Sequence, residues 1–364
     1  MVNTNENQVA HISSVAAEEG QPNTYKCIDM IPNSHTNINH RTINSYSLNQ
    51  LFDASFEPKL QIIKELLYCG TYIFVGPPKI GKSFFMAQLG YHVSKGMDLW
   101  DYPVRQGDVL YLALEDDYSR IQQRLFKMFG EEGSDHLFFA NEALSIQKGL
   151  EEQIELFIKE HKDLTLIIID TLQKIREAQG DKFSYSTDYD VMSRIKHISD
   201  RYNICILIVH HTRKMDAMDS FEMISGTNGI FGAADGAFVL QKKNRTDTKA
   251  ILNITGRDQP DEALELSFDI NRCIWNLEKK RRELPDKLED PFLVKIADFI
   301  GKGEWRGSPT ELYEKLNVDF KSVNTFSRYL NIRTMELYQD YNIYCESKRK
   351  HEGREILLKY IPPK

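Results

Sequence analysis

The chain has 364 residues, of which 41% are hydrophobic and 11% aromatic, so it is long enough to bury one sizeable core and a second, smaller one. Its net charge of −7 excludes a protein that coats nucleic acid by bulk charge, although a local basic face or channel is still allowed. No apolar run is long enough to cross a membrane, the N-terminus lacks the apolar stretch of a signal peptide, and the cysteines are scattered singly. We therefore expect a cytoplasmic protein with no membrane partner.

Composition divides the chain into four segments. Residues 1–45 are rich in Asn, Ser and Thr and lack an apolar period, which predicts a disordered or loosely attached leader. Over residues 46–277, short β-branched runs alternate with helical periods, which predicts an α/β domain. The charged stretch at 278–290 is typical of a linker, and residues 291–364 are expected to form a second domain.

Seven strands and four helices are predicted in the α/β domain. The strands are Tyr72–Val75, Val109–Leu114, Leu166–Asp170, Ile204–His210, Ala237–Gln241, Ala250–Ile254 and Ala263–Phe268. The helices lie near Ser83–Lys95, Tyr118–Phe129, Leu150–Lys159 and Asp188–Tyr202. Nearly continuous apolar strands joined by helices indicate a mostly parallel sheet covered on both faces, and the short turns between the later strands indicate an antiparallel extension.

The C-terminal domain is predicted to be a small α+β unit. Its elements are a helix with Phe292, Ile296 and Ile300 at helical spacing, a helix that begins at the capping box Ser308–Glu311, a longer helix over Ser322–Leu337, and strands Ile343–Ser347 and Arg354–Tyr360. Three helices followed by a β-hairpin have the outline of a winged helix.

A phosphate-binding loop follows the first predicted strand and precedes the first predicted helix. Its residues are Gly76, Pro77, Pro78, Lys79, Ile80, Gly81, Lys82 and Ser83. The loop and the helix N-terminus supply backbone N–H groups, and Lys82 is expected to reach the β- and γ-phosphates. Ser83 is expected to bind Mg²⁺, and Phe84 completes the predicted nucleotide-binding set. The sequence therefore predicts ATP and Mg²⁺ as cofactors.

Carboxylates at the ends of two strands are predicted to complete the catalytic site. An apolar strand ends at Asp170, whose carboxylate can hold hydrated Mg²⁺ together with Ser83. Glu115, Asp116 and Asp117 follow the strand after the P-loop helix, and a carboxylate at that position can activate the attacking water. We take Glu115 as the base, while Asp116 or Asp117 alternatively begins the next helix, where acids are favoured.

In this order, the motifs resemble the RecA-like ATPases of plasmid, phage and mobile-element replication, the group that contains the RepA-type hexameric helicases. The resemblance extends over about residues 66–277 and is carried further by Lys95–Asp116, Val209–Lys214 and Ser225–Asp235. It implies a RecA-like P-loop core, a homo-hexameric ring and DNA helicase activity.

The resemblance also implies a role for the residues after the strand at Ile204–His210. In this family the polar residue at the end of that strand senses the γ-phosphate and is linked to a DNA-binding loop, which corresponds here to His211 and residues 212–229. Alternatively, this histidine only caps a buried strand. Arg213 and Lys214 in the loop are either channel-facing DNA contacts or a solvated basic pair.

An arginine finger is implied by a further likeness. Residues 255–260 are similar to the Lys-x-Arg-x-x-Pro stretch that ring helicases of the DnaB type supply to the neighbouring subunit, and Arg257 is the matching arginine. Thr255 stands where the family has Lys, so a single cation is expected to stabilise the charge that develops during phosphoryl transfer.

Further basic residues are candidate DNA contacts. Lys174 and Arg176 follow the strand that ends at Asp170, at the sheet edge where ligands of open α/β sheets bind, and are expected to contact single-stranded DNA. Lys321 and Arg328 fall on one face of the longest C-terminal helix, where a recognition helix would contact double-stranded DNA. A solvated charged helix is the alternative for the second pair.

The function predicted from these features is that of an ATP-dependent DNA helicase of the replicative, mobile-element type. A recombination or helicase-loading ATPase would share the nucleotide site but would not unwind DNA. A regulator that binds DNA and uses ATP only as a switch is the third hypothesis, and the presence of both Glu115 and Arg257 argues against it.

Overall fold

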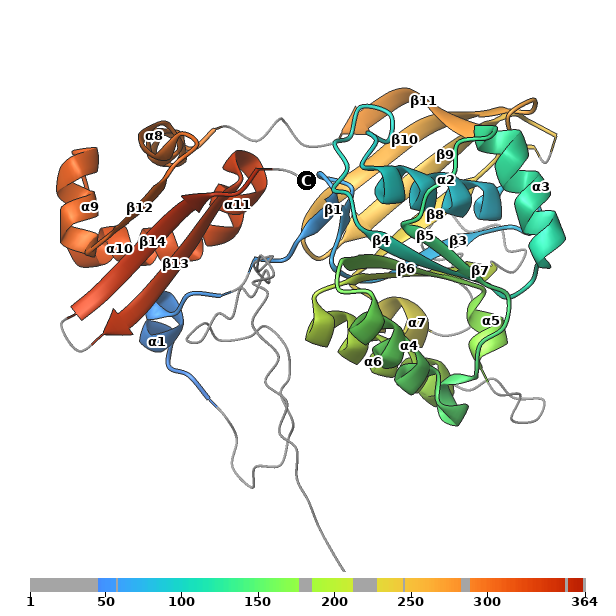
Figure 1. Cartoon of the computed structure of the whole chain (residues 1–364), viewed down its shortest axis with the longest axis horizontal. Coiled ribbons are helices and arrows are strands. Elements are labelled where there is room, and N and C mark those ends of the chain that lie inside the picture. The colour runs from blue at the N-terminus through green and yellow to red at the C-terminus, as the bar shows by residue number, and fades with distance from the viewer. Residues whose placement is uncertain are drawn as a thin grey trace, which may run out of the picture.

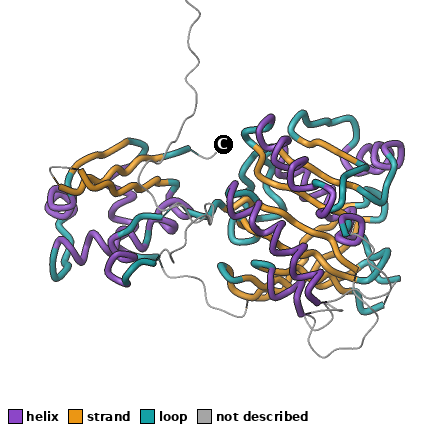
Figure 2. The backbone as a smooth tube through the Cα atoms, turned by 90° about the horizontal axis from the view of Figure 1, so that it is seen from below, coloured by secondary structure: helices purple, strands orange, loops and turns teal. Residues whose placement is uncertain are grey.

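The computed structural model describes residues 45–56, 58–176, 185–211, 228–244, 246–282, 289–350 and 353–362. These residues form a large α/β core and a smaller C-terminal unit, which lie side by side (Figure 1). The view from below in Figure 2 shows the same two units. Apart from residue 45, the predicted leader lies outside the described residues.

The core is built on a nine-stranded sheet with the order β11-β10-β9-β8-β3-β7-β6-β4-β5. Its strands are β3 (Gly70–Gly76), β4 (Asp108–Ala113), β5 (Leu137–Ala140), β6 (Leu164–Asp170), β7 (Cys205–His211), β8 (Gly236–Gln241), β9 (Lys249–Gly256), β10 (Gln259–Asp269) and β11 (Ile274–Arg282). The strands from β8 to β5 in this order are parallel, and β9, β10 and β11 add an antiparallel extension. The predicted α/β fold with a mostly parallel sheet is confirmed.

Helices cover both faces of this sheet (Figure 1). One face carries α2 (Lys82–Lys95) and α3 (Tyr118–Phe129), and the other carries η1 (Ile146–Lys148), α4 (Leu150–Glu160), α5 (Leu172–Ile175), α6 (Tyr185–Tyr202) and α7 (Asn228–Ala233). Successive side chains of β3 alternate between the two cores: Phe74 packs with α2, whereas Ile73 and Val75 pack against the opposite layer. Burial on both faces explains why every residue of β3 is buried.

Two short strands, β1 (Gln61–Ile63) and β2 (Leu67–Tyr68), form a separate antiparallel pair before the core sheet. The helix α1 (Leu48–Asp53) precedes them and lies beside the C-terminal unit, not the core (Figure 1). Within the ranges described above, no helix is both long and apolar enough to cross a membrane.

The C-terminal unit packs helices against a three-stranded antiparallel sheet of order β12-β14-β13. Its elements are α8 (Pro291–Ile300), β12 (Glu304–Gly307), α9 (Pro309–Leu316), α10 (Val323–Ile332), α11 (Thr334–Tyr341), β13 (Ile343–Lys350) and β14 (Gly353–Tyr360). The predicted capping box at Ser308 is present. The unit is α+β, as predicted, with β12 as an additional strand.

The single long helix predicted over Ser322–Leu337 is wrong. The structure breaks it at Arg333, which ends α10 and precedes α11. The bend allows Leu330 of α10 and Leu337 of α11 to be buried in the same core. Apolar spacing alone does not distinguish one long helix from two shorter helices that share a core.

The predicted boundary between core and linker, at residue 278, is also wrong because the first part of the charged run lies within β11. Arg281 forms an ion pair with Glu265 on the neighbouring strand β10, and the Lys280 ammonium lies 3.8 Å from the ring centroid of Tyr102. The charged side chains of the edge strand β11 therefore have partners elsewhere in the core domain.

Candidate nucleotide site

The P-loop connects the carboxyl end of β3 to the first turn of α2. Gly76 must be glycine because a Cβ there would lie 2.6 Å from the carbonyl oxygen of Leu240. Gly81 has φ of 103° and Lys79 has φ of 64°, so the loop turns through the left-handed region twice. Among the described residues, no side chain caps the first turn of α2. Its N–H groups are therefore available to an anion.

The ammonium of Lys82 is at the centre of the site. The residue is 4% exposed, and its ammonium donates hydrogen bonds to the carbonyl oxygens of Gly76 (2.8 Å) and Pro77 (2.9 Å) and to Nδ1 of His211 (2.9 Å). Burial lowers the pKa of Lys82 to about 8. Among the described residues its hydrogen-bond acceptors are neutral, with the charges of Asp170 and Glu115 nearby, and such a buried cation is poised to bind a polyanion.

Ser83 and Asp170 form an oxygen pair next to the P-loop. Ser83 Oγ donates to Asp170 Oδ2 at 2.7 Å, and the hydroxyl of Tyr111 donates to the same oxygen at 3.0 Å. Asp170 is 6% exposed, and burial raises its pKa. Across the described ranges, no three His, Cys, Asp or Glu residues group together to hold a metal without help. One hydroxyl and one carboxylate fit Mg²⁺, which usually takes few protein ligands and shares its coordination with phosphates.

The three acidic residues after β4 have different surroundings. Glu115 is exposed and accepts a hydrogen bond from Thr171 Oγ1 at 3.0 Å, which places it beside the residue after Asp170. Asp116 is held by Arg124 at 2.7 Å, and Asp117 caps α3. Asp117 is therefore a helix cap, one of the two roles that the sequence left open for these acids, whereas Glu115 as the base stays a prediction.

His211 is the last residue of β7, the strand that lies between β3 and β6 in the sheet. Burial, and next the charge of Lys82, lowers the pKa of His211, so its ring is neutral near pH 7 and accepts from the ammonium of Lys82. The contact joins residues that are 129 positions apart in the sequence. Residues 212–227, including Arg213 and Lys214, lie outside the described part of the chain.

Arg257 lies at the opposite edge of the sheet from the P-loop. It follows Gly256, the last residue of β9, which pairs with Gly236, the first residue of β8. The parallel strand β3 also begins at this side of the sheet, whereas the P-loop follows its last residue. Its Nη2 donates to the carbonyl oxygen of Gly232 at 3.2 Å, and Nη1 lies 3.9 Å from Asp235. Its side chain is 59% exposed. In this position Arg257 cannot reach the P-loop of its own chain. Such a position is the one expected of an arginine that acts in the site of a neighbouring subunit.

The structure separates the two predicted DNA contacts after Asp170. Lys174 is exposed on α5. The Arg176 side chain is only 7% exposed and forms an ion pair with Asp188 at 3.0 Å. The prediction that Arg176 contacts DNA is therefore incorrect for this arrangement, because its guanidinium is buried against a carboxylate.

Arg328, the second predicted contact in the C-terminal unit, also has an internal partner. Its Nε donates to Asp53 Oδ1 of α1 at 2.8 Å, and Asn331 on the same face is 4% exposed. Arg354 donates to the carbonyl oxygen of Asp53 at 3.0 Å. The predicted recognition face is thus covered by α1, which corrects the assignment of Arg328, whereas Lys321 remains exposed.

Residues 42–217 match the family model described as an AAA domain. The match covers just under half of the chain, includes the P-loop and the strands that end at Asp170 and His211, and supports an ATPase-type domain here. A comparison with curated proteins finds no match. Among solved structures, an ATPase domain aligns at 13% identity over 58% of this chain and 85% of its own, with a TM-score of 0.47. A DnaB-like replicative helicase aligns at 14% identity over 59% of this chain and 58% of its own, with a TM-score of 0.48.

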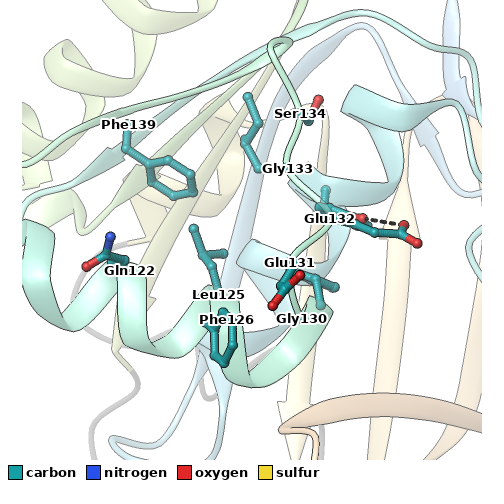
Figure 3. Close-up of a pocket in the computed structure, with 12 residues that line it drawn as sticks. Gln122, Leu125, Phe126, Gly130, Glu131, Glu132, Gly133, Ser134 and Phe139 are labelled. Atoms are coloured by element: carbon teal, nitrogen blue, oxygen red, sulfur yellow. Dashed lines mark hydrogen bonds between the residues drawn. The ribbon is translucent and has the colours of Figure 1, made fainter.

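Two residues of the site were missed in the sequence. Tyr111 and Thr171 hydrogen-bond to Asp170 and Glu115, respectively. Tyr111 could have been found as the one residue with a polar tip in the predicted strand Val109–Leu114. A cavity of about 560 Å³ lies elsewhere, where α3 meets β5 (Figure 3). Phe126 and Phe139 are among the residues that line it, and none of its lining residues belongs to the P-loop.

Proposed function

We propose that the protein binds Mg²⁺·ATP at the P-loop edge of the sheet, hydrolyses it, and uses the energy to move on single-stranded DNA. In this proposal it is a ring-shaped DNA helicase of the replicative, mobile-element type. The observation that carries the proposal is the direct hydrogen bond between Lys82 and His211. It joins the phosphate-binding lysine to the residue that begins the expected DNA loop.

The proposed chemistry assigns one task to each side chain. Lys82 turns from its neutral acceptors to the phosphate oxygens, which compete for its protons more strongly than carbonyl or imidazole groups do. Ser83 and Asp170 would hold Mg²⁺, which offsets the negative charge of the phosphates when bound. Glu115, which is exposed beside this pair, takes a proton from the attacking water.

The proposed coupling follows from the same hydrogen bond. When Lys82 turns to the phosphates, His211 loses its donor, so the end of β7 has a different hydrogen-bond partner before and after nucleotide binding. Arg213 and Lys214 follow that end, and Lys174 lies exposed after the neighbouring strand β6. We assign these three cations to single-stranded DNA. Repeated around a ring, they would concentrate positive charge although the whole chain is acidic.

The test compares the ATPase rate and strand displacement with and without single-stranded DNA. The parent protein is expected to hydrolyse faster with DNA and to displace a strand. His211→Ala should keep much of the basal rate and lose most of the stimulation, whereas His197→Ala, an exposed histidine on α6, should behave as the parent does. Stimulation without displacement would support a recombination or loading ATPase. A rate unaffected by any DNA would support a nucleotide-switched regulator.

A further inference from the structure

An aromatic cluster lies beside the P-loop, at the same edge of the sheet. β8 ends at this edge, β10 ends there and β11 begins there, because the antiparallel extension reverses direction twice after β8. Phe268 at the end of β10 and Trp275 at the start of β11 have ring centroids 4.9 Å apart. Phe84, in the first turn of α2, is 5.6 Å from Phe268. The cluster therefore adjoins the helix N-terminus that receives the phosphates.

Trp275 fixes this cluster to the P-loop. Its side chain is fully buried, and its Nε1 donates to the carbonyl oxygen of Gly81 at 3.2 Å. A Cβ at Gly81 would lie 3.0 Å from the indole, so the loop backbone rests directly on this ring. Trp275 is a packing residue, but Phe84 and Phe268 are each only partly buried. The aromatic cluster thus extends from the buried indole that contacts Gly81 to two rings that are partly accessible beside the P-loop.

A cation accompanies the aromatic rings. The ammonium of Lys242, just after β8, lies 5.7 Å from the ring centroid of Phe268 and 5.3 Å from that of Trp275. On the other side, the guanidinium of Arg124 lies 5.2 Å from the ring of Phe84 and is held by Asp116. Arg124 is already paired with Asp116, whereas Lys242 lies over ring faces and, among the described residues, only the charge of Asp247 acts on it besides. A half-buried ammonium over aromatic rings can donate to a further acceptor.

We propose that Phe84 and Phe268 form the surface on which the nucleotide's base stacks, and that Lys242 donates a hydrogen bond to an acceptor atom of the base. The side of the P-loop toward β7 and β6 holds His211 and Asp170, so the base is expected on the other side, over the extension. A heteroaromatic base offers both a π face for the rings and ring acceptors for the ammonium. The inference rests on the proposed nucleotide binding.

The test separates the base from the phosphates by measuring dissociation constants for Mg²⁺·ATP and for Mg²⁺·tripolyphosphate. Phe268→Leu keeps an apolar side chain beside Trp275 and removes the aromatic face, and Lys242→Met keeps the stem and removes the charge. Phe268→Leu should bind ATP about tenfold more weakly, since stacking on one ring contributes about that factor or more. Lys242→Met should also bind about tenfold more weakly, since a hydrogen bond from a charged group contributes about as much. Binding of tripolyphosphate should not change. Lys243→Met, on the exposed neighbouring lysine, is the matched control and should leave both constants unchanged.

The outcomes distinguish this inference from the proposed function. If both ligands weaken together in folded variants, the cluster only supports the P-loop; if neither weakens, the base lies elsewhere. Either result overturns the inference. If the parent protein binds neither ligand, the proposed function fails instead. Thermal melting of each variant shows whether a weakened constant comes from loss of folding, and Phe268→Tyr, which restores an aromatic face, should recover ATP binding.

Discussion

The buried lysine of the P-loop should make nucleotide binding depend on pH. Burial lowers the pKa of Lys82 from 10.5 to about 8. Phosphates favour the charged amine, so bound nucleotide raises this pKa, and affinity is highest below pH 8 and falls as the pH rises through it. Roughly nine-tenths of the free protein carries the charged lysine near pH 7 and about one-tenth near pH 9, so the Kd for Mg²⁺·ATP should rise about tenfold, or about 1.4 kcal/mol.

The same shift affects the stability of the ligand-free protein in the opposite direction. Because the folded-state pKa of Lys82 is below its ordinary value, the unfolded chain binds more protons than the folded chain between about pH 8 and 10.5. The contribution of this residue to the free energy of unfolding therefore rises with pH across that window. Weaker binding at high pH is thus not explained by loss of folding at this site.

Calorimetric titration with Mg²⁺·ATP from about pH 7 to about pH 9.5 measures the effect, above the range where His211 titrates. Lys82→Met should bind weakly and show no change near pH 8. Lys79→Asn is the matched control in the same loop, because asparagine tolerates the positive φ at this position. A constant Kd over the range in the parent, or the same inflection in Lys82→Met, would refute the argument.

Three further predictions concern the base, the finger and the cover on the C-terminal unit. Glu115→Gln should keep Mg²⁺·ATP binding and lose about 100-fold or more in turnover, whereas Asp116→Asn should lose far less; equal losses would contradict the assignment of the base. Mixing Arg257→Ala subunits with Glu115→Gln subunits should restore part of the turnover, since some interfaces then join an intact finger to an intact base; no recovery at any ratio would argue against action in a neighbouring site. Urea denaturation of Arg328→Ala, Asp53→Ala and the double variant should show a coupling of about 0.5–1 kcal/mol, and a coupling near zero would indicate that this ion pair does not hold α1 in place.

Local patterns were sufficient to predict much of the core. The P-loop, β6 and α3 agree with the sequence analysis to within a few residues, because turn chemistry and apolar runs are encoded in neighbouring residues. The antiparallel extension was likewise predicted from its short turns. Leu137–Ala140, only four residues long, was missed as β5, since such a run carries little periodicity.

Other errors arose where charge was interpreted without knowledge of its partner. Arg176, Arg328 and Arg281 were each assigned to a DNA contact or a linker, and each has an acidic partner in the structure. The partner of Arg328 lies 275 residues away. Exposed and paired arginines have the same sequence signature, and only the packing of distant elements distinguishes them.

The sequence by itself determined the phosphate-binding loop, because its glycines, lysine and serine act through the backbone of one short segment and the helix that follows it. The tertiary structure decided what surrounds that loop. The order of strands in the sheet brings His211 to Lys82 over 129 residues and Trp275 to Gly81 over 194 residues. No local periodicity encodes such contacts, since they depend on which strands lie next to one another and which edge each strand reaches.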